Sequence, residues 1–542
     1  MRPALIFGIA IVIIDAAVAS ATKKPNFILY FPDTLRAESH TPYGAPLDTT
    51  PHLNKFASGG VLFEQAHVMH TQCSPSRCTM LTGRFMHVGG HRTQTHLIQD
   101  YEANYFRALK ENGYHVEMIG KNDVFSGNAL NLSVSHWDAK IGYASGPNAF
   151  DFPQPGYFSF LSSGSNISGA DESNGDYAAV RQAISFLQSK PPEPFVLFLP
   201  TRGAHPPYGA PREWHSKFTP EQVKAAGITL RPRGISGMPT YMSAKAGIPH
   251  YRNLEPLDDD FFYRVQAVYL GMVAYTDWLF GELLSGLAAA DGGRLERKTA
   301  VIFSSDHGDF SGDYGLVEKW PGSMSDVLTR VPLVVRLPGG VAGGVARAPV
   351  QTADVLETML DVAGINASWE RFGVSLRAQL EQGAQGDMGR DVFGEGGFYF
   401  RNEQQEEAGE CLADCPRGLY CPRGQEEAQP NGSPRASMIR NLTAKLVYRP
   451  TGVSELYDLV VDPRETANLY TSSAHATLRA ELLVRLLDHH VLTSDVTPTH
   501  TDRRGLPKFP YLLPSSDPWA APMTMTPTRE DDPLAINGVS QV

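Results

Sequence analysis

Four short apolar runs constrain this chain more than any other feature, because each is followed by residues that can ionise. The runs span residues 26–31, 116–119, 195–199 and 300–304. A short run that is apolar on both faces is typical of a central parallel strand, which is buried on both sides. In open α/β sheets, ligands bind beyond the carboxyl ends of such strands. The pattern therefore predicts parallel strands with a functional site at one edge of the sheet.

Helical patterns lie between these runs and after them. Residues 177–190 place apolar side chains on one face, which is typical of an amphipathic helix, and residues 261–287 carry the longest helical pattern. Residues 209–258, rich in Pro, Gly and Arg, predict an irregular insertion over the active site that would select the substrate. Further helices are expected at 102–112, 352–363 and 475–490, and further strands at 331–337, 436–448 and 454–459.

Composition and charge narrow the functional class. The chain has 542 residues, of which 42% are hydrophobic and 19% charged, so it can form one large domain and a smaller one. Its net charge of −11 gives no basic footprint for nucleic acid or for an anionic membrane. Any positive charge that binds an anion must therefore be local.

The N-terminus and the sequons indicate the secretory pathway. Residues 1–21 read as a signal peptide, with Arg2, an apolar run over 4–14 and small residues at the cleavage site. The apolar run is too short to span a bilayer, so a membrane anchor is the weaker alternative, and no later stretch predicts a transmembrane span. We expect an extracellular or lysosomal glycoprotein. Sequons begin at Asn131, Asn166, Asn366, Asn431 and Asn441.

The stretch from Cys73 to Arg84 carries the strongest chemical signal. Cys73 lies four residues before Arg77, and Pro75 stands close to the start of a predicted helix. The positive field of a helix N-terminus and a guanidinium favours a thiolate and attracts an anion. The stretch therefore predicts a nucleophile in an anion-binding pocket. The alternative is a buried structural cysteine.

The same stretch resembles the signature of the type I sulfatases, Cys-x-Pro-Ser-Arg-x-x-x-Leu-Thr-Gly. The resemblance implies that Cys73 is oxidised to formylglycine by a formylglycine-generating enzyme during secretion. The hydrated aldehyde would then be the nucleophile. The matching residues are Cys73, Pro75, Ser76, Arg77, Leu81, Thr82 and Gly83.

Two strand ends supply the metal ligands that this family implies. Asp33 follows the first strand, and Asp306 and His307 follow the strand at 300–304. Carboxylates suit a hard cation, so we expect one Ca²⁺, with Mg²⁺ possible, bound by these three residues and by the modified Cys73. Many sulfatases carry a second Asp after the first, and Thr34 replaces it here. Without the resemblance, Asp33 would be read as a helix cap and Asp306–His307 as a turn.

Four further residues match catalytic positions of the family. Lys121 and Lys319 would bind the sulfate together with Arg77, and His205 would protonate or hydrogen-bond the leaving alcohol. Asp123 stands where many sulfatases have histidine, as in a subgroup resembling arylsulfatase K. A carboxylate facing the formylglycine hydroxyl could accept the proton that drives sulfate release.

The resemblance covers about residues 25–490 and implies an α/β fold of the alkaline-phosphatase type. Such a fold has a mixed, mostly parallel sheet between helices, with a smaller C-terminal α+β subdomain. The late cysteines predict a local disulfide of undetermined pairing, with a zinc site as the rival. We expect a signal peptide at 1–21, a catalytic domain at 22–395, a polar excursion at 396–434 with Cys411, Cys415 and Cys421, a C-terminal subdomain at 435–495 and a Pro/Thr-rich tail at 496–542.

The predicted function is hydrolysis of a sulfate ester on a sugar, glycan or aryl group. Two alternatives remain open at this point. One is a phosphodiesterase or phosphonate monoester hydrolase of the same superfamily, because a metal, a nucleophile and a cationic pocket also suit phosphate. The other is a non-catalytic protein that binds sulfated glycans, which the departures at Thr34 and Asp123 suggest.

Overall fold

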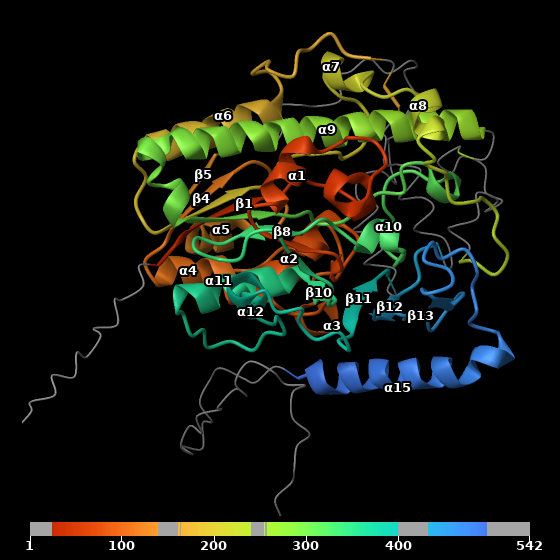
Figure 1. Ribbon diagram of the computed structural model, residues 1–542. Coiled ribbons are helices and arrows are strands. Elements are labelled where there is room, and N and C mark those ends of the chain that lie inside the picture. The colour runs from red at the N-terminus through yellow and green to blue at the C-terminus, as the bar shows by residue number, and fades with distance from the viewer. Residues whose placement is uncertain are drawn as a thin grey trace, which may run out of the picture.

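An eight-stranded sheet forms the centre of the protein in the computed structural model (Figure 1). The structure describes residues 24–138, 161–162, 164–239, 254, 257–398 and 432–495. Every strand of the sheet runs in the same direction except β8, which is antiparallel to both of its neighbours. The strands in spatial order are β5 (His136–Asp138), β4 (His115–Ile119), β6 (Phe195–Leu199), β1 (Asn26–Tyr30), β7 (Thr299–Phe303), β8 (Val334–Arg336), β2 (Val61–Phe63) and β9 (Gly344–Ala346).

Helices cover both faces of the sheet, which explains why β1 is buried throughout. Alternate side chains of a strand point to opposite faces. Phe27 and Leu29 belong to one buried cluster, and Ile28 and Tyr30 to the other. The first cluster includes residues of α2 (Cys73–Thr82), α4 (Tyr105–Glu111) and α11 (Thr352–Ala363), and the second residues of α6 (Gly175–Gln188) and α9 (Asp259–Ala289) (Figure 1). The predicted sheet between helices is therefore confirmed.

A second, four-stranded sheet lies beside the first. It is antiparallel throughout and carries α15 (Ala476–Thr493) (Figure 1). Lys445 and Arg440 of this sheet form ion pairs of 2.9 Å with Asp326 of α10, which fixes the sheet to the catalytic domain. Its strands are β11 (Val392–Gly396), β12 (Ala436–Arg440), β13 (Ala444–Tyr448) and β14 (Glu455–Asp458). The remaining elements include α1 (Pro51–Ala57), β3 (Ala66–His67), α3 (Met86–Gly89), α5 (Gly127–Ser133), α10 (Asp326–Thr329), β10 (Val350–Gln351) and α12 (Arg377–Gln382).

Two sequence predictions need correction. Residues 436–448 form two strands, because Asn441 makes a turn in which its side-chain oxygen accepts the N–H groups of Thr443 and Ala444. The segment 209–258 is not irregular throughout: α7 (Arg212–His215) and α8 (Pro220–Ala225) lie along α9 (Figure 1). Cys411, Cys415 and Cys421 lie outside the described residues, and the predicted domain boundaries stay predictions.

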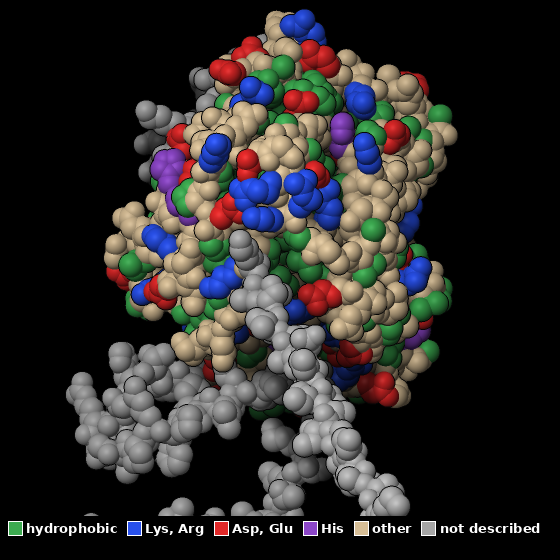
Figure 2. Space-filling view, turned by 60° about the vertical axis from the view of Figure 1, so that its left-hand side comes forward, with side chains coloured by type: hydrophobic (Ala, Val, Ile, Leu, Met, Phe, Trp, Pro, Cys, Tyr) green, Lys and Arg blue, Asp and Glu red, His purple; other side chains and the backbone are tan. Residues whose placement is uncertain are grey.

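Two predictions from composition concern the charge of the surface and membrane-spanning helices. Acidic and basic side chains are interspersed on the face shown in Figure 2, with several basic groups near its middle. Among the described residues, no helix combines the length and the apolar content that crossing a bilayer requires.

Asp277 of α9 provides a pH-dependent contribution to stability. Its carboxylate accepts the N–H groups of His52 (2.9 Å) and Leu53 (2.7 Å) at the start of α1. Burial raises the pKa of Asp277 to about 7, although these two hydrogen bonds oppose the shift. A raised folded-state pKa gives stability that is complete below the unfolded value near 3.8 and is lost as pH rises through 7.

We therefore expect Asp277→Asn to remove this dependence. Relative to the variant, the free energy of unfolding of the parent protein should fall by roughly 1.4 kcal/mol per pH unit between pH 4 and 7. Urea unfolding of both proteins across this range measures the difference. Parallel curves for the two proteins would contradict the assignment.

Candidate active site

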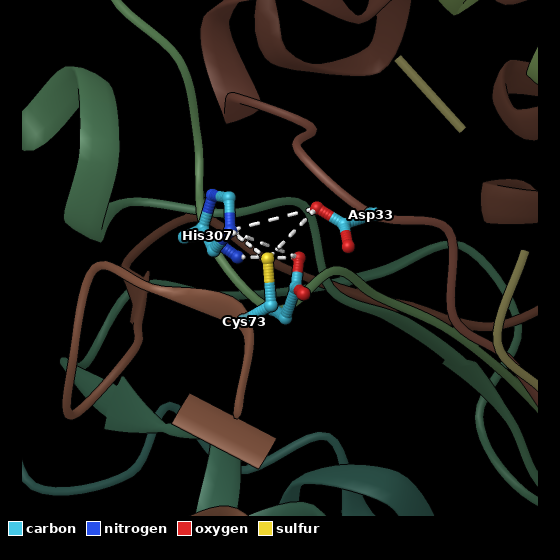
Figure 3. A group of neighbouring side chains, drawn as sticks. Asp33, Cys73 and His307 are labelled. Atoms are coloured by element: carbon cyan, nitrogen blue, oxygen red, sulfur yellow. Dashed lines mark hydrogen bonds and ion pairs between the residues drawn. The ribbon is translucent and has the colours of Figure 1, made fainter. Parts of the chain in front are cut away.

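The strand ends bring the predicted metal ligands into one cluster (Figure 3). Asp33 follows β1, Asp306 and His307 follow β7, and Cys73 is the first residue of α2. One potential ligand atom from each lies within 4.8 Å of those of the other three, and all four residues are buried. Residues from three distant parts of the sequence therefore meet at the edge of the sheet that the strand pattern predicted.

Cys73 lies at the centre of this cluster. Its Sγ is 3.2 Å from Nε2 of His307 and 3.7 Å from Oδ1 of Asp33 (Figure 3). Burial, reinforced by the charge of Asp33, raises the pKa of the Cys73 thiol far above its usual value. The expectation that a positive field favours a thiolate is therefore wrong, because burial outweighs the nearby cations. An unmodified thiol here is a poor nucleophile at neutral pH.

Arg77 connects the two carboxylates. It lies one helical turn after Cys73, so both side chains leave the same face of α2. Its Nη2 is 3.1 Å from Asp33 and 2.7 Å from Asp306, and its Nε is 2.9 Å from Asp306. The remaining nitrogen, Nη1, is buried without a hydrogen-bond partner among the described residues. Arg77 thus stabilises the carboxylates and still has one donor for an anion.

Lys121 extends this charge network to Asp123. Its Nζ lies 2.5 Å from Asp33 and 2.7 Å from Asp123. Burial lowers the pKa of Lys121, but the two carboxylates outweigh it and hold that pKa well above the usual range. Within the described residues no hydrogen bond joins Asp123 to Cys73. Asp123 is therefore paired with Lys121, and its predicted position facing the nucleophile stays a prediction.

His205 and Lys319 form a second pair. Nδ1 of His205 lies 2.6 Å from the carbonyl of Pro206, so that nitrogen carries the proton and Nε2 accepts from Lys319 Nζ at 2.5 Å. Burial and the charge of Lys319 lower the pKa of His205 well below its usual value. His205 is thus neutral, and Lys319 is the proton-bearing member of the pair.

The environment of His307 and Asp33 fits a cation. Nδ1 of His307 donates to the carbonyl of Gly308 at 2.8 Å, so the lone pair on Nε2 faces the cluster, 3.5 Å from Oδ1 of Asp33. Burial lowers the pKa of His307, which keeps the imidazole neutral. Two carboxylates and an imidazole whose lone pairs converge form a donor set that divalent cations accept.

Sequence reasoning gave no role to three residues of the site, although Ser76 is part of the matched signature. Ser76 donates to the backbone carbonyl of Asp306 at 2.6 Å and so orients the strand end. The hydroxyl of Tyr208 donates to Asp309 at 2.6 Å and accepts the N–H of Glu318 at 2.8 Å, which positions the segment that carries Lys319. Asp309 stands next to the Asp306–His307 motif, and that proximity was the available signal.

Comparison with known proteins agrees with this geometry. The Sulfatase family model matches residues 25–365. N-acetylglucosamine-6-O-sulfatase of Bacteroides thetaiotaomicron is 24% identical over 518 residues, covering 85% of either chain. Iduronate 2-sulfatase of Mus musculus is 28% identical over 364 residues, covering 60% of this chain and 61% of its own. Arylsulfatase K of Homo sapiens is 26% identical over 375 residues, covering 66% of each.

Solved structures share the fold. A phosphonate monoester hydrolase of Agrobacterium radiobacter superposes with a TM-score of 0.68 at 21% identity, covering 86% of this chain and 96% of its own. A structure solved with its substrate D-glucosamine-2-N,6-O-disulfate gives a TM-score of 0.63 at 20% identity, covering 87% and 99%. Because the family model spans more than half of the sequence, the chain belongs to the sulfatase family, whose members hydrolyse sulfate esters.

Proposed function

We propose that this protein releases inorganic sulfate from a sulfated sugar or glycan. The observation that carries the proposal is the single cluster in which Cys73 and Arg77, one turn apart on α2, meet the carboxylates after β1 and β7. Relatives named for sulfated sugars, N-acetylglucosamine-6-O-sulfatase and iduronate 2-sulfatase, support this substrate class.

The nucleophile in this proposal is formylglycine at position 73, formed from Cys73 by a formylglycine-generating enzyme. One hydroxyl of the hydrated aldehyde attacks sulfur, the bond from sulfur to the ester oxygen breaks, and the alcohol leaves with a proton. The second hydroxyl then loses its proton, the carbon–oxygen bond to sulfate breaks, and the aldehyde is regenerated. Each step thus exchanges one covalent bond for another, with no net oxidation.

Charged residues of the chain transfer protons and stabilise the sulfate. Lys319, whose Nζ donates to Nε2 of His205 at 2.5 Å, carries the proton that goes to the leaving oxygen, and His205 orients this ammonium group. Arg77, through its free Nη1, and Lys121 stabilise the sulfate oxygens as negative charge develops. Asp123 takes the proton of the second step through its contact with Lys121.

We propose Ca²⁺ as the bound cation, with Mg²⁺ as the alternative. Asp33, Asp306, His307 and the modified residue 73 would hold it, because their potential ligand atoms cluster within 4.8 Å. When bound, such an ion supplies Lewis acidity that neutralises sulfate charge.

Thr34 offers a direct test of the cation site. Its backbone lies in the left-handed region (φ 66°), which Asp and Asn tolerate better than the β-branched Thr. We expect Thr34→Asp to restore a second carboxylate and raise Ca²⁺ affinity by roughly tenfold, since ligand charge tunes such sites. Calorimetric titration measures the change. Thr34→Asn is the matched neutral control, and equal dissociation constants for the two variants would contradict the placement.

The secretory route is part of this proposal. It rests on the signal-like residues 1–21 and on the sequons at Asn131, Asn166 and Asn366, which are exposed. At Asn441 the side-chain amide is engaged in the turn, and its nitrogen donates to Asp391 at 3.2 Å. We expect endoglycosidase to reduce the mass of the secreted protein, with glycans on the three exposed sites; a secreted protein without glycans would contradict this.

The decisive experiment measures the mass of the peptide that contains residue 73. The protein is secreted from a host that has the formylglycine-generating enzyme, and sulfate release from an aryl sulfate and a sulfated glucosamine is then assayed. An aldehyde mass together with sulfate release supports the proposal. An intact thiol, with glycan binding and no turnover, would replace it with the binding-protein alternative.

Phosphonate ester hydrolysis is the second candidate function, favoured by the fold similarity to phosphonate monoester hydrolases. The same preparation separates the two functions. We expect kcat/KM for an aryl sulfate to exceed that for a phenyl phosphonate monoester, and the reverse order would favour phosphonate hydrolysis.

A further inference from the structure

A second group of potential metal ligands lies outside the cluster around Cys73. His87 of α3, Glu395 of β11 and His489 of α15 place one potential ligand atom each within 4.8 Å of the other two. Glu395 and His489 are buried, and His87 is nearly so. His87 and Glu395 are 308 positions apart in the sequence, and Glu395 and His489 are about 90 apart, so the fold alone brings the three together.

The hydrogen bonds of His87 leave its Nδ1 in need of a cation or a proton. Thr493 has a single hydroxyl proton, which it donates to the carbonyl of His489 at 2.7 Å. Nε2 of His87, 2.8 Å from the same hydroxyl oxygen, must therefore be the donor in that contact. Nδ1 of His87 contacts Oε1 of Glu395, and two lone pairs cannot face each other at such a distance. A proton must therefore lie between them, and a metal ion could take its place only if the two atoms moved apart.

His489 supplies a second imidazole, one nitrogen of which has no hydrogen-bond partner among the described residues. Its ring stacks on Phe393 with centroids 3.7 Å apart, and the residue is only 2% exposed. Nε2 of His489 is buried and has no hydrogen-bond partner among the described residues. Burial and the neighbouring His490 lower the pKa of His489 to about 3, so the ring is neutral at physiological pH. A buried neutral imidazole without a partner is costly unless a ligand uses it.

Glu395 completes the donor set. Burial raises the pKa of Glu395, but the hydrogen bond with His87 and the charge of Arg92 outweigh it and lower that pKa to about 2. Arg92 binds Oε2 at 2.9 Å and leaves Oε1 for His87 or an ion. Metal-binding carboxylates commonly hold such an outer partner, and metal-binding imidazoles commonly donate through their other nitrogen, as His87 does to Thr493.

We propose that His87, Glu395 and His489 bind a Zn²⁺ ion that fastens α15 and the C-terminal sheet to the segment after the Cys73 helix. Two imidazoles and one carboxylate, with water in the fourth position, form a recognised zinc ligand set. Tetrahedral zinc ligands lie about 3.3 Å apart, so ligand atoms up to 4.8 Å apart need to close by about 1.5 Å at most. Nδ1 of His87 and Oε1 of Glu395, which are in contact, need to move apart. His490 lies outside this group of ligand atoms, and its Nε2 is 2.8 Å from the hydroxyl of Ser437.

The test measures zinc bound to the full-length, metal-stripped protein after reloading and desalting. His489→Phe keeps a ring that can stack on Phe393 but removes the ligand nitrogen, and His307→Gln is the matched control in the active site. We expect His489→Phe to lose about one equivalent of zinc and His307→Gln to retain that equivalent. Equal zinc content in His489→Phe and the parent protein, or a parent protein that binds no zinc, would overturn the proposal.

Two further measurements test the zinc site without the His489→Phe variant. Zinc binding to the parent protein should release about one proton, because the ion replaces the proton between His87 and Glu395. Co²⁺ in place of zinc should give the visible absorption of a tetrahedral site, and Glu395→Gln should abolish it. If Co²⁺ gives this absorption equally in Glu395→Gln, the ion is bound elsewhere and the proposal fails.

Discussion

Replacing Cys73 by Ser is expected to reduce sulfate turnover by at least roughly 10³-fold. A serine hydroxyl can still be sulfated, but its sulfate ester has no second hydroxyl on the same carbon to expel sulfate. The variant should therefore release up to one equivalent of alcohol per protein and then stop. Release of alcohol and of sulfate, followed separately on an aryl sulfate, distinguishes this arrest from a general loss of binding.

Cys78→Ser is the matched control for this experiment. Cys78 lies on the same helix, is equally buried and is also a free cysteine, but its Sγ contacts only backbone carbonyls, those of Val124 at 3.6 Å and His96 at 3.9 Å. It should keep both the aldehyde at position 73 and turnover. If Cys73→Ser turned over at the parent rate, the nucleophile would be another residue.

Replacing Arg77 by Met is expected to lower the free energy of unfolding by about 3–5 kcal/mol in protein from which metal ions have been removed with a chelator. The change leaves Asp33 and Asp306 buried without their shared partner. Added Ca²⁺ should restore part of this loss, since the ion again neutralises the carboxylates. Turnover should fall by roughly 10²–10³-fold, because a donor to the sulfate is lost. Chemical unfolding with and without Ca²⁺, and steady-state kinetics, measure the two effects.

Arg84→Met is the control for Arg77→Met. Arg84 follows the same helix and is partly exposed, and its Nε bonds the carbonyl of Glu370 at 2.9 Å. Losing a hydrogen bond of this kind should cost about 1 kcal/mol and should not depend on Ca²⁺. Equal, Ca²⁺-independent losses in the two variants would contradict a carboxylate-bridging role for Arg77.

The sequence was sufficient for the parts of the site that follow from local pattern. Apolar runs predicted the central strands, and because parallel strands end at the same edge, Asp33 and Asp306 could be expected to meet. A helix was predicted to start just after Pro75, whereas α2 already begins at Cys73, so only the structure places Cys73 and Arg77 on one helix face. Their predicted catalytic roles remain predictions, although the geometry brings these residues together.

What sequence reasoning missed depends on contacts between distant segments. Nothing near Asp123 in the sequence reveals that Lys121 joins it to Asp33. The carboxylate of Asp277 holds the start of a helix more than 200 residues away, and the His87–Glu395–His489 group joins three elements. The raised pKa of the Cys73 thiol was mispredicted for a related reason: local charges were visible in the sequence, whereas burial depends on packing by the whole fold.

The burial of α2 also sets an order of events during biosynthesis. All ten residues of the helix are buried, and Cys73 is only 4% exposed. The helix ends at Gly83, whose left-handed backbone (φ 69°) packs so closely against Tyr105 that a Cβ would lie 2.7 Å from the tyrosine hydroxyl. If Cys73 is oxidised as proposed, the oxidising enzyme has no access once the helix has packed, so this maturation would have to precede folding. Molecules that fold before they are oxidised would keep the thiol permanently. The active fraction of a preparation would then depend on the rate of Cys73 oxidation relative to the rate of folding in the cell that made it.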